Sequence, residues 1–211
     1  MFIRVLIFFF GLCVLSLGIS TVTNAGLGTG TVSSVAYVLN ELCGLSIGFF
    51  VFLTNVFFFV LQIIVDPEKV FVKALKQLPI CFVFGVIFDI AMEITAQITT
   101  DSYFEQVLMA CIGSVVTGLG IASMVFARLA ILPPEGLCLS IMKRWGGSFG
   151  NLRMGVDVFL VLATVVISWF SLGTIIGLRE GTLITACCSG QVSKLFLILW
   201  HHFFPEHSPI D

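Results

Sequence analysis

Charge is scarce in this sequence. Only 10% of the 211 residues are charged, whereas 58% are hydrophobic and the mean hydropathy is +1.13. A soluble domain carries roughly 25% charged residues, so the composition indicates a protein that lies in lipid. The net charge of -2 and the lack of a basic stripe exclude a nucleic-acid partner.

Motifs for enzymes, pumps and metal sites are also missing. The seven cysteines form no CxxC pair, and the histidines do not have the spacing of zinc ligands. We interpret the cysteines as small apolar residues between helices. The sequence has no Walker motif, no HExxH and no serine–histidine–aspartate arrangement. It therefore predicts neither an enzyme nor an ATP-driven pump, and no cofactor or metal is expected.

Long apolar runs are abundant. A spanning helix needs about 20 apolar residues, and six runs fit: Val5–Thr23, Leu45–Val65, Leu78–Ile98, Phe104–Ala127, Met154–Leu172 and Thr182–Trp200. Two shorter segments, Ser33–Leu42 and Gly136–Trp145, cannot cross. The fourth run also carries small residues that predict close helix packing: Gly113, Ser114, Thr117, Gly118 and Gly120.

Lysine and arginine residues place both termini in the cytoplasm. With Arg4 inside, six spans put the basic residues of 69–76 and 128–153 on the same side, and only Arg179 falls outside. This positive-inside pattern predicts a multi-pass protein of the inner membrane, with lipid as its partner. The sequence is compatible with a homodimer and does not decide the oligomeric state. The letters "TNA" before Gly26 resemble a signal-peptide cleavage site, but the first run is long for that role.

The order of elements repeats within one membrane domain. Residues 1–100 and 101–211 each contain a span, a segment rich in glycine or proline (called the soft segment below), a short helix and two further spans, in that order. We align 26–48 with 131–153, shifted by one residue so that Gly30 falls on Gly136 and Gly44 on Gly150. Because each half crosses an odd number of times, we expect the halves to be inserted in opposite directions, as in many secondary transporters.

The soft segments, "GLGTG" (26–30) and "LPPEG" (132–136), predict a ligand site. Non-helical backbone is tolerated inside a bilayer only where protein or a water-filled cavity satisfies it. The start of a re-entrant half-helix presents free N–H groups and partial positive charge, so two facing starts would bind an anion or polar solute. The predicted substrate-binding residues are Gly28, Gly30, Thr31, Asn55, Glu135 and Gly136. The alternative is a pair of surface loops with interfacial helices.

Charged residues inside predicted spans include Asp89, Glu93 and Lys194. Asp89 and Glu93 share a helix face, and Lys194 matches Asp89 in the repeat. Ionisable groups inside membranes are functional sites by default, so we predict that Asp89 or Glu93 couples binding to a proton or cation. The alternative is an ion pair between Asp89 and Lys194 that locks the halves together. Asp157 shares a face of the fifth span with Thr164 and Ser168, and Arg153, four residues before it, is placed near the inner interface.

The motifs resemble a bacterial membrane family. A first span ending in "GLGTG" (26–30), then "GLSIG" (44–48) and "GLREGT" (177–182), resembles the YczE/YyaS/YitT-like proteins over nearly the whole chain. The resemblance implies a polytopic inner-membrane protein and little about its substrate. That family often has "GP" where this chain has Gly30-Thr31 and Gly190-Gln191, so a shared ligand does not follow.

The expected function is that of a secondary transporter. An all-α protein of six spans and two re-entrant half-helices would move a small polar or anionic solute by alternating access. The alternative is a non-transporting regulator or assembly partner that binds another protein through the amphipathic segment 66–77. A channel ranks last, because the asparagine signature of water and glycerol channels is missing.

Overall fold

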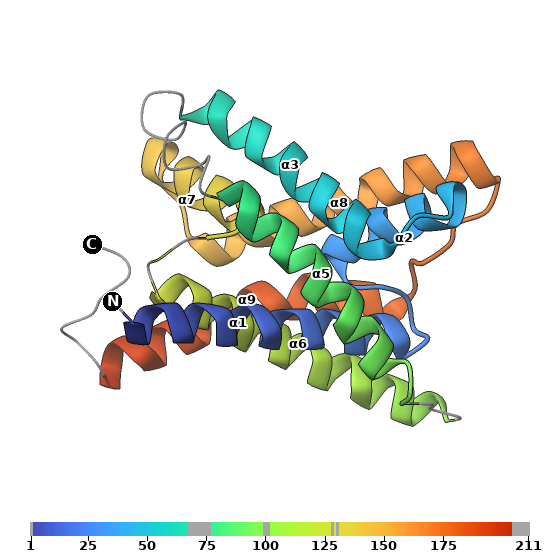
Figure 1. The fold of residues 1–211 in the computed structure, drawn as a ribbon, viewed down its shortest axis with the longest axis horizontal. Helices are drawn as coiled ribbons and strands as arrows, with labels where there is room; N and C mark the ends of the chain where they lie inside the picture. The colour runs from blue at the N-terminus through green and yellow to red at the C-terminus, as the bar shows by residue number, and fades with distance from the viewer. Residues whose placement is uncertain (1, 67–76, 99–101, 128, 130, 204–211) are drawn as a thin grey trace.

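The computed structural model describes residues 2–66, 77–98, 102–127, 129 and 131–203. Within these ranges it contains no strand and eight helices, which confirms the all-α prediction (Figure 1). The helices are α1 (Phe2–Asn24), α2 (Thr31–Cys43), α3 (Ile47–Val65), α5 (Gln77–Thr95), α6 (Tyr103–Ala127), α7 (Pro133–Trp145), α8 (Phe149–Leu172) and α9 (Glu180–Phe203).

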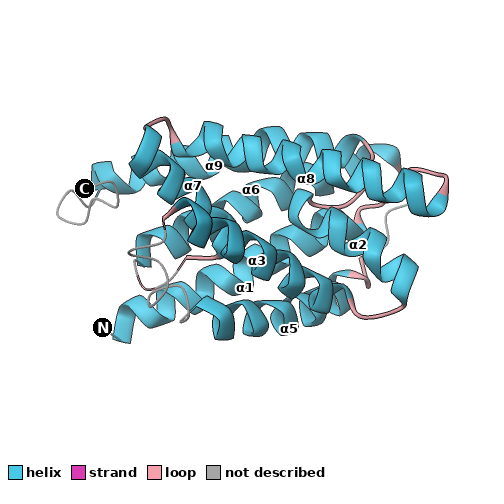
Figure 2. Ribbon diagram, turned by 90° about the horizontal axis from the view of Figure 1, so that it is seen from above, coloured by secondary structure: helices cyan, strands magenta, loops and turns pink. Residues whose placement is uncertain are grey.

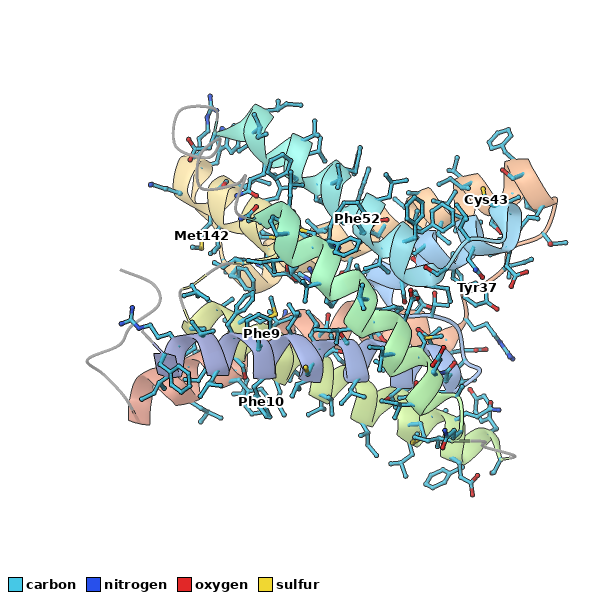
Figure 3. The ribbon with its side chains drawn as sticks, in the orientation of Figure 1. Phe9, Phe10, Tyr37, Cys43, Phe52 and Met142 are labelled. Atoms are coloured by element: carbon cyan, nitrogen blue, oxygen red, sulfur yellow. The ribbon has the colours of Figure 1, made fainter. Side chains whose placement is uncertain are left out.

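Five helices are long and apolar enough to span a membrane: α1, α3, α5, α6 and α8. They coincide with five of the six predicted spans. The sixth span corresponds to α9, a helix of 24 residues that is not among these five, so the count of six stays a prediction. Large apolar side chains face outward, among them Phe10 of α1 (Figure 3) and Phe170 of α8, which are 64% and 85% exposed. Such contiguous exposed apolar surface is typical of a membrane protein.

The helices form two groups, which are joined by α5 and by the contact of α9 with α8. In Figure 1, α1, α6 and α9 run side by side, and α3, α8 and the short helices α2 and α7 lie on the other side of the molecule. The view from above in Figure 2 shows α2 and α7 at opposite ends of the same group. Helix α5 contacts both α1 and α3. Each short helix contacts the two long helices α3 and α8.

Helices α1 and α6 approach closely through glycines. A Cβ atom on Gly18 would lie 2.6 Å from the hydroxyl oxygen of Thr117, and one on Gly120 would lie 2.7 Å from the Cα atom of Leu15. Backbones approach this closely only where side chains are absent. The packing role predicted for the small residues of the fourth run is confirmed here.

The short helices share their length and their surroundings. Both α2 and α7 have 13 residues, and a glycine caps the C-terminal end of each, Gly44 for α2 and Gly146 for α7. Helix α7 begins with Pro133 and Pro134, which suits a first turn whose N–H groups have no helical partner. The chain then turns into α3 and α8, which begin after the capping serines Ser46 and Ser148.

These shared boundaries correct the alignment of the two halves. Gly44 corresponds to Gly146, not to Gly150, and the residue that corresponds to Gly30 at the helix start is Leu132, not Gly136. The alignment made from the sequence is displaced by about one helical turn, because Gly146 and Gly150 lie one turn apart and either can be matched to Gly44. Gly150 instead corresponds to Gly48, since both follow a capping serine by the same distance.

Candidate functional site

An ion cluster of Glu135, Arg153 and Asp157 lies in the interior. The Nη1 atom of Arg153 donates a hydrogen bond of 2.7 Å to Oε1 of Glu135, and its Nη2 atom lies 3.3 Å from Oδ1 of Asp157. The three residues are only 0–3% exposed. A buried charge is costly unless it is paired, so the position of each charge here depends on the other two.

The two carboxylates are held unequally. Asp157 accepts a hydrogen bond of 2.7 Å from the Thr31 hydroxyl and one of 3.2 Å from the Ser189 hydroxyl, in addition to its ion pair with Arg153. Glu135 has only Arg153, and its Oε2 atom is buried without a partner among the described residues. The Nε atom of Arg153 is also buried and has no hydrogen-bond partner among the described residues. The cluster therefore has spare capacity to accept a proton at Glu135 and to donate a hydrogen bond from Arg153.

The first turns of both short helices reach this cluster. Thr31 is the first residue of α2, Glu135 is the third residue of α7, and both bond to residues of α8 that lie one turn apart. A helix start carries partial positive charge and unpaired N–H groups. The two helix starts therefore favour negative charge at the point where Arg153 also supplies a positive charge.

Each short helix also contacts the long helix of the other half. The Ser34 hydroxyl of α2 lies 2.8 Å from that of Thr164 on α8. At the matching position of α7, a Cβ atom on Gly136 would lie 2.8 Å from Oε1 of Gln62 on α3. Gly136 thus leaves room for the Gln62 amide, whose Oε1 atom is buried and unpartnered among the described residues.

Of the predicted binding residues, Glu135 belongs to the cluster and Thr31 donates a hydrogen bond to it. Asn55 is buried on α3, where its amide nitrogen donates to the backbone oxygen of Val51 and its Oδ1 atom has no partner in the described part of the chain. Gly30 caps the start of α2 and lies against Ile19.

Gly28 has a packing role that the sequence did not indicate. Its φ of +105° suits glycine, and a Cβ atom there would lie 2.6 Å from the backbone nitrogen of Arg179. The neighbouring Thr29 donates its backbone N–H to the Gly177 oxygen at 2.8 Å, and Gly181 donates to the Leu27 oxygen at 2.8 Å. The motifs "GLGTG" and "GLREGT" therefore bind each other and fix the entry into α2 against the start of α9.

The predicted coupling charges do not join the ion cluster. Asp89 is partly buried and accepts a hydrogen bond of 2.7 Å from the backbone N–H of Gly48, whereas Glu93 and Lys194 are exposed. No ion pair joins Asp89 to Lys194, so that alternative is wrong. The Lys194 side chain instead lies near Gly150.

Sequence reasoning missed Arg153 and Asp157 as the centre of the site. Neither was predicted as a site residue, but Arg153 is 1% exposed, Asp157 is fully buried in protein, and both belong to the ion cluster. Arg153 was placed at the edge of the span because the apolar run begins at Met154, whereas the helix begins at Phe149. An arginine and an aspartate four residues apart at the edge of an apolar run are the signal that could have revealed them. Most of the amphipathic segment 66–77 lies outside the described residues.

Comparison with known proteins gives the family. The sequence signature of a family of unknown function (DUF6198) matches residues 2–197, so the chain belongs to that family. It is also 28% identical to "Uncharacterized protein YyaS" of Bacillus subtilis (strain 168) over 200 residues, which cover 93% of this chain and 94% of that protein. The resemblance to YyaS-like proteins is thereby confirmed. No solved structure matches the chain.

Proposed function

We propose that this member of the DUF6198 family is a secondary transporter that moves a small polar or anionic solute across the inner membrane. Six spans and two re-entrant half-helices, α2 and α7, would form two inverted repeats around the ion cluster. The observation that carries the proposal is a buried arginine, shared by two carboxylates, at the point where two short helix starts converge on α8.

The directions of the helices support the inverted repeats. Following the colours of Figure 1, α1 and α6 run in opposite directions, as do α3 and α8, and α5 and α9. Contacts also correspond between the halves: Gly48 of α3 lies against Gly85 of α5, and Gly150 of α8 lies against Gly190 of α9. Transporters built from inverted repeats bind their solute near the repeat interface, where discontinuous helices begin.

The energetics also favour a functional role. A charged group inside a membrane protein is costly to insert and is a functional-site hypothesis by default. A purely structural bundle would gain as much stability from apolar side chains of similar size, because burying an ion pair costs desolvation energy.

Alternating access is tested by measuring whether the cluster can be reached from each side. In a background with all seven cysteines replaced by alanine or serine, Ser189→Cys puts a thiol beside Asp157. For a transporter we expect membrane-impermeant thiol reagents to modify it from either face of oriented membranes. Arg179→Cys and Arg144→Cys serve as controls, each reacting from a single face. Reaction of Ser189→Cys from one face only, or from neither, would favour the non-transporting role.

A further inference from the structure

The unequal environments of the two carboxylates suggest which one moves. Asp157 has three donors, from α2, α8 and α9, whereas Glu135 is held by Arg153 alone. Hydrogen bonds to a buried carboxylate stabilise its charge. Glu135 is therefore the carboxylate that can be displaced from Arg153 at the smaller cost.

We propose that Arg153 binds the carboxylate of a small monocarboxylic acid anion in place of Glu135, and that Glu135 takes up one proton as it is displaced. The inference rests on the proposed transport function. The proton comes from the solution to which the site is open and forms an O–H bond on Glu135, while the ion pair between Glu135 and Arg153 breaks. Arg153 then pairs with the incoming carboxylate. Release of the anion on the other side reverses each step and returns the proton to solution.

Charge balance selects a monovalent anion. With Glu135, Arg153 and Asp157 all ionised, the cluster carries a charge of -1, because it has two carboxylates and one guanidinium. With Glu135 protonated and a monovalent anion bound, the charge is again -1. A divalent anion would leave a further negative charge in a low-dielectric interior, where it is costly. A neutral solute would not replace the ion pair that Arg153 loses.

The geometry of the donors favours a carboxylate among monovalent anions. The Nη1 atom that Glu135 would release already binds a carboxylate oxygen at 2.7 Å. The Nε–H group of Arg153 is a second donor without a partner among the described residues. A guanidinium binds carboxylates well because its planar donors match their oxygens. An anion carrying the same chemical group as Glu135 therefore fits the position that Glu135 vacates.

The groups around Glu135 are consistent with a single proton site. Arg153 and Asp157 face it from α8, the Cys138 thiol lies on its own helix, and the Cys81 thiol approaches it from α5. From α3 the nearby polar group is the Gln62 amide, which does not titrate. Among the described residues, Glu135 is thus the carboxylate of this set whose single hydrogen-bond partner is the arginine that it would release.

The wild-type chain, reconstituted in liposomes, provides the first test. The probes are radiolabelled glycolate, lactate and benzoate, with neutral lactamide and divalent malonate as comparisons. With an alkaline interior we expect at least one monocarboxylate to enter at an initial rate well above that in protein-free liposomes, where the neutral acid crosses the bilayer unaided, and to accumulate about tenfold per pH unit, the ratio set by coupling to one proton. An internal pH dye should report one proton per anion, and an imposed membrane potential should have no effect.

Three outcomes would overturn the inference: preferred uptake of malonate or lactamide, uptake driven by the membrane potential, or no uptake of any of the three monocarboxylates. The cysteine-access experiment distinguishes these failures from failure of the proposed function. If Ser189→Cys reacts from both faces while no monocarboxylate enters, alternating access stands and the substrate class is wrong.

Glu135→Gln is the second test. It keeps the side-chain size and removes the proton site, so we expect accumulation driven by the pH gradient to be lost and uptake to follow the membrane potential instead. Glu41→Gln, a change at an exposed carboxylate of α2, should behave as the wild type. If Glu135→Gln does not fold, the proton stoichiometry of the wild type still decides. Retention of one-proton coupling by a folded Glu135→Gln protein would refute the assignment, as would its loss in Asp89→Asn.

Discussion

Asn55 and Asp157 occupy the same position in the two halves of the chain, counted from the serines that cap α3 and α8, but only one of them is charged. The same holds for Val51 and Arg153, and for Ser33 and Glu135, which are the third residues of α2 and α7. The two halves thus share a backbone plan, whereas all three members of the ion cluster come from the second half.

The difference shows how two similar halves can take different roles. The second half supplies the charges, and the first half supplies neutral donors and acceptors, namely the Thr31 hydroxyl and the amides of Asn55 and Gln62. A second charged set in the first half would add to the electrostatic cost of the interior. A neutral set supports the one charged site without competing for Arg153.

The largest loss of stability is expected when Arg153 is replaced by an uncharged residue, because its counterpart in the first half, Val51, carries no charge. Arg153→Met leaves Glu135 and Asp157 without their cation, so we expect a loss of about 3–5 kcal/mol in the free energy of unfolding. Val51→Ala, at the matching position of α3, removes only apolar contacts and should cost roughly 1–3 kcal/mol. Thermal unfolding of the two detergent-purified proteins measures both. Equal melting temperatures would contradict the structural role of the cluster.

A smaller difference in stability is expected between alanine substitutions at Gly48 and Gly150, the glycines at which α3 contacts α5 and α8 contacts α9. A Cβ atom on Gly48 would lie 2.6 Å from Oδ2 of Asp89, whereas one on Gly150 would lie 3.3 Å from the Gly190 oxygen. Gly48→Ala should therefore destabilise the protein by about 1–3 kcal/mol through overpacking, and Gly150→Ala should cost less. The same unfolding assay orders the two variants, and the reverse order would show that the crossing of α8 and α9 is the tighter one.

The smallest effects are expected at Asp89 and Lys194. Asp89→Asn keeps an oxygen that can accept the Gly48 N–H, so it should change the free energy of unfolding by about 1 kcal/mol or less. Lys194→Met, at an exposed position, should stay within about 0.5 kcal/mol. Assays of expression and melting temperature would show a larger loss in either variant if these charges have a structural role that the present contacts do not indicate.

The positions of the helices could be predicted from the sequence, and the centre of the site could not. Runs of apolar residues located every long helix, and glycine and proline marked both short ones, because these signals are local. Thr31 and Glu135 were found since they lie at the predicted helix starts. The partner of Thr31, however, is 126 residues away in the sequence. Such a contact depends on how α2 and α8 pack, which periodicity does not specify.

The contacts of α2 with α8 have a consequence for biogenesis. Thr31 and Ser34 find their partners on Asp157 and Thr164, and Thr29 finds its partner on Gly177, so the polar start of α2 has no settled environment while only the first half has left the ribosome. Lateral release of the early helices from the translocon would therefore precede the final placement of α2. Thr29, Thr31 and Ser34 complete these hydrogen bonds only after the second half of the chain has been inserted.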